Sequence, residues 1–215
     1  CGQGAAFCNK IWNAFRLVKG WEISDEIAQP EPNVKAIEWM QAQLRTYVAE
    51  INDLYSKYRL NEALMAMFKL FTDEFSGWYL EMIKPAYQAP IDRKTLEATM
   101  QIFGQLLQII HPFMPFITEE LYQHIAERKD GESIMVDTLV LDAPTAEDAQ
   151  LMAQYEEAKQ IISGVRAVRQ SKNISPREPL TLEIVQSADA GKNVTQCPAL
   201  NAIIKKMASL AEIQN

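Results

Sequence analysis

Apolar side chains recur at helical spacing through the first 110 residues of this 215-residue chain. Four stripes repeat every three or four positions, the spacing that places side chains on one face of an α-helix. They comprise Phe7, Ile11, Ala14, Phe15 and Val18; Ile37, Met40, Leu44, Val48, Ile51, Leu54 and Tyr58; Leu64, Phe68, Phe71, Phe75, Trp78 and Met82; and Leu96, Met100, Phe103, Leu107 and Ile110. Long amphipathic helices joined by short polar connections pack antiparallel, so the pattern predicts a helical bundle.

Prolines and a capping residue mark the expected ends of these helices. Pro30 and Pro32 place a break before the second helix, because proline restricts both its own backbone and that of the preceding residue. Asn61 is expected to cap the third helix with its side-chain oxygen. Lys84-Pro85 is expected to end that helix.

The segment HPFMPFITEEL, residues 111–121, interrupts the apolar pattern with two prolines. Pro112 disfavours helical geometry at His111, so the fourth helix should stop there. Pro115 suits the first turn of a new helix, where the missing N–H is no loss. A lone histidine at such a break is more typical of a hydrogen-bonded structural residue than of a catalyst.

Two expectations concern the other side chains of this segment. Phe113, Met114 and Phe116 should be buried at the end of the bundle while the chain turns. Glu119 and Glu120 should lie near the positive end of the new helix's dipole, which favours carboxylates. Adjacent residues on a helix point in different directions, so these two form no catalytic carboxylate pair.

The pattern changes after about residue 130. SIMVDTLVL, residues 133–141, predicts a short connecting strand, and a helix should follow from about Thr145 to Ser171. LTLEIV, residues 180–185, alternates like a second strand, and a last helix should cover 199–210. We therefore predict a mainly α fold, with an antiparallel helical bundle in residues 1–130 and a small α/β appendix in residues 131–215.

The composition indicates a folded chain outside the membrane. Apolar residues make up 48% of the sequence, yet no uninterrupted apolar run approaches the roughly 18–20 residues of a membrane span. Cys1, Cys8 and Cys197 are odd in number and widely spaced, which fits neither a disulfide framework nor a zinc site. We expect a reducing, cytoplasmic location and no membrane partner.

The net charge of −7 argues against nucleic acid, but its distribution is uneven. Residues 1–21 carry three basic residues and no acid, and residues 151–215 carry eight basic and six acidic residues. Two basic zones thus flank an acidic middle. Charged helix surfaces are often merely solvated, so the pattern alone leaves RNA binding open.

Enzymatic motifs are absent from the sequence. It has no glycine-rich phosphate loop, no G-x-S-x-G elbow, no H-E-x-x-H and no CxxC, and its two histidines lie in no recognisable motif. We therefore expect no catalytic site, no metal and no cofactor in this chain.

A polar surface on the first helix, hereafter the polar face, consists of Asn9, Lys10, Asn13 and Arg16. Asn9, Asn13 and Arg16 fall at i, i+4 and i+7, opposite the apolar stripe. Two carboxamides and a guanidinium without acidic neighbours can donate to phosphates and read base edges. The alternative is that these are ordinary surface residues.

A second candidate, the basic ridge, consists of Arg166, Arg169 and Lys172. These residues recur every three positions along one helix. Ile161, Ile162, Val165 and Val168 would supply its buried side. Such spacing favours contact with successive phosphates.

Four stretches resemble, in this order, the region that follows the catalytic domain of valyl-tRNA synthetases. They are FCNKIWNAFR (7–16), LNEALMAMFKLFTDEFSGWYLEMIKP (60–85), HPFMPFITEELY (111–122) and VRAVRQSKNISPREPLTL (165–182). HPFMPFITEEL is shared among the related class I synthetases for valine, leucine, isoleucine and methionine. The first and last stretches are the ones that point to valine.

The resemblance implies a helical domain that binds the anticodon arm of tRNA(Val). Under it, the polar face would contact that arm and the basic ridge would contact the RNA backbone. The catalytic domain with its ATP site, the editing domain and the coiled coil of the family would lie outside this chain. Cys1 would then be an internal cut point, and the segment alone would neither activate valine nor transfer it.

The sequence departs from the family at two places. Ala5-Ala6 stands where the family usually has Arg-Asn, and Gly77 stands where it often has aspartate. The neighbouring Trp78-Tyr79 pair is expected in the core rather than as a stacking platform for bases. Two alternatives stay open: the same domain from an isoleucyl- or leucyl-tRNA synthetase, and a helical protein-interaction scaffold without an RNA role.

Overall fold

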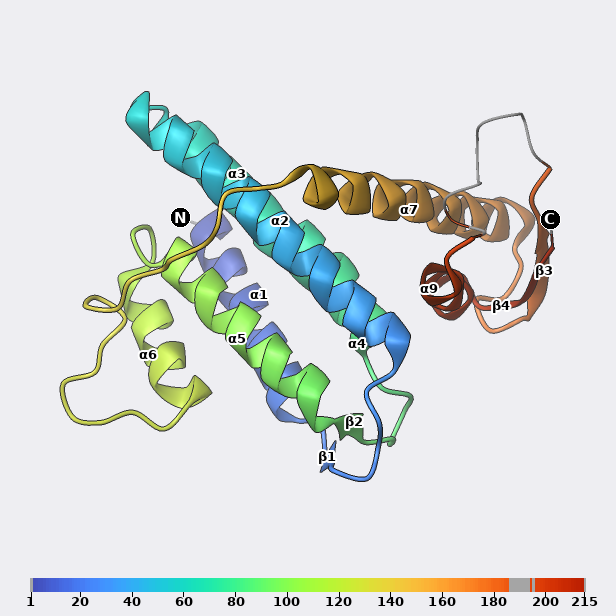
Figure 1. Cartoon of the computed structure of the whole chain (residues 1–215), viewed down its shortest axis with the longest axis horizontal. Helices are drawn as coiled ribbons and strands as arrows, with labels where there is room; N and C mark the ends of the chain where they lie inside the picture. Colours follow the sequence, from blue (N-terminus) through green and yellow to red (C-terminus); the bar gives the residue numbers. More distant parts are fainter. Residues whose placement is uncertain (1, 186–193, 195, 215) are drawn as a thin grey trace.

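A computed structural model describes residues 2–185, 194 and 196–214 and contains the four helices that the apolar stripes predict. They are α1 (Gly2–Lys19), α2 (Glu31–Ser56), the composite helix α3–η1–α4 (Leu60–Lys69, Leu70–Tyr79 and Leu80–Ile83) and α5 (Arg93–Ile110). Consecutive helices run in opposite directions (Figure 1), and α2 packs against both the composite helix and α5. The predicted antiparallel bundle is confirmed.

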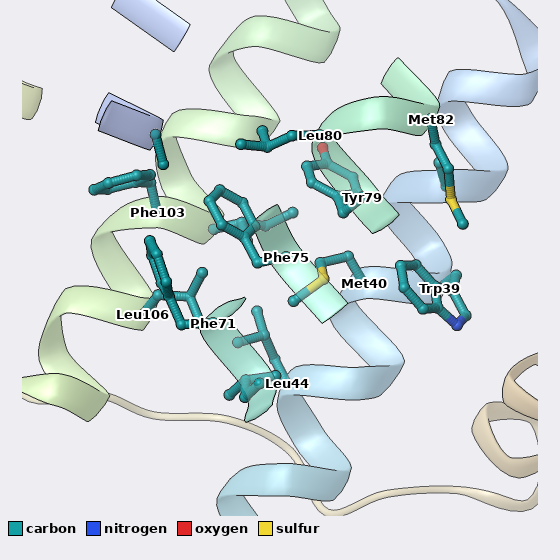
Figure 2. Close-up of a cluster of buried hydrophobic side chains, with 14 of the residues drawn as sticks. Trp39, Met40, Leu44, Phe71, Phe75, Tyr79, Leu80, Met82, Phe103 and Leu106 are labelled. Carbon is teal, nitrogen blue, oxygen red and sulfur yellow. The ribbon is translucent and has the colours of Figure 1, made fainter. Parts of the chain in front are cut away.

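Aromatic side chains fill the centre of the bundle. Phe75 is fully buried, with its ring centroid 5.6 Å from that of Phe103 and 5.6 Å from that of Tyr79. Figure 2 shows the Phe75 and Tyr79 rings between α5, which carries Phe103, and Met40 of α2. The Tyr79 hydroxyl lies 2.8 Å from the Thr99 hydroxyl, so its polar end is satisfied inside the core.

The third helix departs from simple α-helical geometry. Its middle segment η1 has π-helical i→i+5 hydrogen bonding, which changes the phase of the side chains that follow. Phe71, Phe75 and Met82 of the predicted stripe are buried, whereas Trp78 is only partly covered. The expected cap at Asn61 is wrong, because the helix begins at Leu60 and Arg59 occupies the cap position without a side-chain cap bond. The predicted end at Lys84-Pro85 is confirmed by α4.

The two prolines act as expected at the end of α5. The helix ends at Ile110, and α6 (Pro115–Ile125) begins with Pro115. The ring nitrogen Nδ1 of His111 lies 2.7 Å from the Thr118 hydroxyl. His111 is therefore a structural residue of this turn.

The side chains around this turn differ from expectation. Phe113 and Met114 are partly buried, but Phe116 is 90% exposed, so its predicted burial is wrong. The reason is helical phase, because α6 packs on the bundle through Thr118, Leu121 and Tyr122, and Phe116 lies on the opposite side.

The carboxylates of α6 also have another role than expected. No acidic residue lies in the first turn of α6, so Glu119 and Glu120 are too far along it for a cap. Glu119 instead accepts hydrogen bonds from the Ser133 hydroxyl at 2.7 Å and from the Ile134 N–H at 3.1 Å. It thereby fixes the loop that follows α6.

The predicted connecting strand at 133–141 is wrong. This segment has no strand pairing and crosses the bundle as a loop after α6 (Figure 1). Ile134 is buried, while Met135, Val136 and Val140 are each at least 75% exposed. An alternating apolar pattern needs a neighbouring strand to form a ladder, and among the described residues none lies beside this one.

The C-terminal region otherwise follows the sequence pattern. It contains α7 (Ala146–Lys172), β3 (Leu180–Glu183), α9 (Pro198–Ala208) and β4 (Leu210–Gln214). β3 pairs with β4 in parallel, and a second short parallel pair, β1 (Ile23–Ser24) and β2 (Ile91–Asp92), lies at the end of the bundle. The predicted helix–strand–helix order is confirmed, although the pairing partner of β3 was not anticipated.

The start of α7 is fixed both locally and by the bundle. Thr145 accepts a hydrogen bond from the Asp148 N–H, and the Asp148 side chain accepts one from the Thr145 N–H, which completes a capping box. The same Asp148 carboxylate receives two hydrogen bonds from Arg45 of α2, at 2.6 and 2.8 Å. This contact sets the position of α7 along α2.

The C-terminal helices share a hydrophobic core with the bundle. Tyr155 and Ile162 of α7 and Leu200 of α9 belong to the same buried cluster as the bundle aromatics, and the Tyr155 ring stacks on Trp39 at 5.3 Å. The division into regions 1–130 and 131–215 stays a prediction.

Candidate nucleic-acid interface

The polar face lies entirely at the surface of α1. Asn9, Lys10, Asn13 and Arg16 are exposed, while the opposite side of the helix buries Phe7, Ile11, Ala14, Phe15 and Val18. The helix contains no acidic residue, and its last turn carries Arg16 and Lys19. The predicted geometry of this face is therefore confirmed, and its role in binding stays a prediction.

The side chains of the polar face are available for an external partner. Within the described part of the chain, none of these four side chains takes part in a hydrogen bond, ion pair or ring contact. Trp12, 38% exposed, lies beside them on the same helix. Free carboxamides, two cations and an exposed indole provide hydrogen bonds, charge and a stacking surface, which are the means of recognising unpaired RNA.

The basic ridge is not a continuous surface. Arg169 is 5% exposed and donates to the carbonyl oxygens of Ser175 at 2.7 Å, Ala208 at 3.1 Å and Ser209 at 2.9 Å. These last two carbonyls lie at the end of α9, where unsatisfied C=O groups carry partial negative charge. Arg169 thus joins α7 to α9, and its predicted exposure to RNA phosphates is wrong.

The other two members of the ridge remain at the surface. Arg166 is exposed, donates to the Met207 carbonyl at 3.1 Å and lies 5.8 Å from the centre of the Trp78 ring. Lys172 is exposed in the last turn of α7. Both can still meet a phosphate, but they no longer form a row of three.

The burial of Arg169 has a signal in the sequence. Residues seven apart lie on the same side of a helix, and Arg169 follows the buried Tyr155 and Ile162 at this spacing. Position 169 therefore belongs to the packed side of α7. Residues three apart are rotated relative to one another around a helix. The basic ridge therefore combines the buried Arg169 with the exposed Arg166 and Lys172.

A cavity of about 690 Å³, hereafter the α5–α6 cavity, was not anticipated from the sequence. It lies between the end of α1, one face of α5, the end of α6 and residues 137–140. Gln101, Gln105 and Gln108 line it at i, i+4 and i+7 of α5, the spacing that the polar face also shows. This repeat of glutamines is visible in the sequence and is the feature by which the cavity could have been anticipated.

Burial and hydrogen bonding fix the far wall of this cavity. Tyr122 is 4% exposed, and its hydroxyl donates a short hydrogen bond to Asp137. Burial, assisted by this carboxylate, raises the pKa of Tyr122 to about 12, so the phenol stays protonated at physiological pH. The tyrosine acts there as a donor to the loop.

The described residues contain neither a candidate metal site nor a candidate membrane-spanning helix. They contain no group of three or more His, Cys, Asp or Glu side chains that could hold a metal ion. No helix in that part of the chain is both long and apolar enough to cross a membrane.

Comparison with known proteins gives a consistent result. A family described as the anticodon-binding domain of tRNA ligase matches residues 38–185. A valine–tRNA ligase of Phocaeicola vulgatus is 52% identical over 214 residues, which cover 100% of this chain and 23% of the relative. The corresponding enzyme of Parabacteroides distasonis is 51% identical over 213 residues, covering 99% of this chain and 23% of the relative.

A more distant relative also matches along the whole chain. The valine–tRNA ligase of Fusobacterium nucleatum is 30% identical over 223 residues, covering 99% of this chain and 25% of the relative. The chain thus spans about a quarter of the length of the curated relatives that it matches.

Proposed function

The chain belongs to the family of anticodon-binding domains of tRNA ligases, and from this premise we propose that it binds the anticodon arm of tRNA(Val). The domain would act within a valine–tRNA ligase, whose remaining parts would join valine to the tRNA with ATP. Its own task would be to hold the tRNA and to report the identity of the anticodon.

The observation that carries this proposal is the polar face. Asn9, Lys10, Asn13 and Arg16 are exposed and without partners in the described part of the chain, on a helix that has no acid. On a chain with a net charge of −7, such a surface is where an RNA phosphate meets the least repulsion. Lys10 and Arg16 would meet phosphates, and Asn9 and Asn13 would meet base edges. Arg166 and Lys172 would add backbone contacts.

Titration of a valine tRNA transcript at several salt concentrations tests the proposal. The double variant Lys10→Gln/Arg16→Gln should bind more weakly, and the slope of log affinity against log salt should fall by roughly 0.7–0.9 for each phosphate that is no longer neutralised. Asn13→Ala should instead reduce the preference for valine tRNA over a non-cognate tRNA and leave the slope nearly unchanged.

Lys57→Gln is the matched control, because Lys57 is an exposed lysine that pairs with Asp53 at the end of α2. It should leave both the affinity and the slope as they are. A wild-type chain that binds no tRNA at low salt would contradict the proposal and favour a protein-interaction scaffold.

A further inference from the structure

The α2–α3 hairpin ends in an exposed apolar tip, and we infer that this tip docks against the part of the intact ligase that leads into α1. The inference rests on the proposed function, because it takes this chain to be one region of a valine–tRNA ligase. It adds to that function a contact with the rest of the enzyme rather than with RNA.

The tip consists of the end of α2 and the start of α3. It extends beyond the start of α1 and the end of α5 (Figure 1). Tyr58, Leu60 and Met65 are 89%, 56% and 65% exposed there. Single exposed apolar side chains are ordinary, but large ones that occur close together are typical of an interaction site.

Tyr58 has a backbone conformation that is unfavourable for its side chain. Its φ is 57°, in the left-handed region. The Arg59 N–H donates to the Leu54 carbonyl at 2.9 Å and the Tyr58 N–H to the Tyr55 carbonyl at 3.0 Å, the two bonds that close a helix at its C-terminus. Glycine is the usual residue at such a position, because a large side chain is strained there. The Tyr58 ring is almost fully exposed, so contacts within this chain do not offset that strain, and a contact outside it would.

A groove of about 710 Å³, hereafter the α1–α3 groove, lies between α1 and the α2–α3 hairpin. Its apolar lining comes from all three helices and consists of Phe7, Leu54, Met65, Ala66 and Phe68. Met65 belongs both to this lining and to the exposed tip. The tip and the groove therefore form one surface that an apolar partner can cover.

The charges along the α1–α3 groove favour protein over RNA as its occupant. It is lined by three carboxylates and two ammonium groups, those of Glu50, Glu62, Asp73, Lys10 and Lys69. The excess of carboxylates disfavours an RNA phosphate. A protein segment can instead cover the apolar lining and place basic residues opposite the acids.

The polypeptide that leads into α1 enters beside this groove. α1 begins at Gly2, and the next residue, Gln3, lines the groove. This chain covers 23% of the matched ligases, so about three quarters of such an enzyme lies outside it. A segment tethered within a few residues of an apolar surface has a high effective concentration there. That segment is therefore the occupant that the position of the groove favours.

The experiment measures how fast a maleimide modifies a cysteine introduced into the intact ligase. Met65→Cys probes the docking surface. Tyr87→Cys is the matched control, because Tyr87 is 92% exposed in the loop between α4 and β2, at the opposite end of the bundle (Figure 1). In the intact ligase the thiol at position 65 should react at least ~10-fold more slowly than the thiol at position 87, since a covered thiol reacts only when the contact opens. In the 215-residue chain the two should react at similar rates.

A second variant tests Tyr58 as the anchor of this contact. Tyr58→Gly removes the ring and suits the left-handed backbone, so α2 should end as before. Combined with Met65→Cys in the intact ligase, it should return labelling to within about threefold of the rate in the 215-residue chain, because anchors carry most of the energy of a contact. Gln88→Gly is its matched control, since Gln88 is exposed with a φ of 59° and lies beside Tyr87. It should leave the protection of position 65 unchanged.

The outcomes distinguish this occupant from others. Equal labelling of positions 65 and 87 in the intact ligase would overturn the inference. Protection of position 65 that grows with the concentration of the 215-residue chain would assign the surface to a second copy, and protection that requires added tRNA would assign it to RNA; either result overturns the inference. Protection that survives Tyr58→Gly would overturn the role of Tyr58 as the anchor. The proposed function is judged separately, by the salt dependence of Lys10→Gln/Arg16→Gln.

Discussion

The bundle core and the junction between the bundle and α7–α9 are both buried and apolar, but the junction adds buried ionic contacts to its apolar ones. In the bundle core, Phe71, Phe75 and Phe103 contact one another through ring faces and edges. At the junction, lysine ammonium groups bind acceptors of the bundle. Lys159 forms an ion pair with Glu74 at 2.5 Å, and Lys206 donates a hydrogen bond to the Met82 carbonyl at 2.9 Å. Hydrophobic contacts are non-directional, whereas each of these ion pairs and hydrogen bonds requires its partner at a defined distance and angle.

This difference predicts two kinds of failure. Loss of a ring leaves a cavity, whose cost depends on how far the surroundings collapse. Loss of one ion leaves the other buried and uncompensated, and that cost disappears when both are removed. Lys159 illustrates the second case, since its side chain is 8% exposed and its ammonium also lies 4.9 Å from the Trp39 ring centre.

The largest effect is expected in the bundle core. Phe75→Ala should lower the free energy of unfolding by about 4 kcal/mol, because the ring is fully buried between two other rings. Phe116→Ala is the matched control, since Phe116 is 90% exposed and should lose less than about 0.5 kcal/mol. Urea denaturation of both variants measures the difference, and equal losses would contradict the description of the core.

The next effect tests whether the junction depends on pairing. Lys159→Met should cost about 3 kcal/mol, because it leaves the Glu74 carboxylate buried, with the Gln43 amide as its one remaining side-chain partner among the described residues. The double variant Glu74→Leu/Lys159→Met should be more stable than Lys159→Met alone. A double-mutant cycle in which the two losses simply add would show that the ions do not interact.

The smallest of the three effects is a pH dependence at the start of α7. Hydrogen bonding to Arg45 lowers the pKa of Asp148 to about 2, against the opposing effect of burial. A folded pKa below the unfolded value of 3.8 means that the ion pair stabilises the protein above about pH 4 and that this stabilisation is lost as the pH falls towards 2. The contribution at neutral pH is on the order of 2 kcal/mol.

Asp148→Asn isolates this contribution from the other carboxylates. Its stability relative to wild type should be about 2 kcal/mol lower at pH 6, and the gap should narrow between pH 4 and pH 2. Denaturant titrations across that range measure the gap. A gap that stays constant with pH would mean that Asp148 acts only as a helix cap.

Local pattern predicted the helices because their phase depends on nearby residues. The stripe of α1 placed Phe7 and Ile11 inside and Asn13 outside, as the structure has them. The strand expected at 133–141 failed because a strand depends on a partner that its own residues do not encode. The loop is held instead by Glu119, a residue that the sequence placed near the positive end of the helix dipole.

The candidate site shows the same limit. The exposure of the polar face follows from helical phase alone, so the sequence predicted it. Arg169 was expected at the surface because it recurs at a spacing of three with Arg166 and Lys172, but the carbonyl end of α9 offers it a buried set of acceptors. The α5–α6 cavity is formed by α1, α5, α6 and residues 137–140, which are far apart in the sequence. The repeated glutamines of α5 were the feature of the sequence that could have indicated it.

The π-helical segment η1 has a consequence for how this family can vary in length. Buried residues follow α-helical spacing from Ala63 through Met67 and Leu70 to Glu74, yet the next positions at that spacing, Gly77 and Glu81, are exposed. Just beyond η1, Met82 is buried in place of Glu81, so the buried position lies one residue later than that spacing predicts. The helix therefore accommodates the equivalent of a one-residue insertion. A homologue with one residue fewer between 70 and 79 would keep both buried faces simply by winding this segment as an ordinary α-helix.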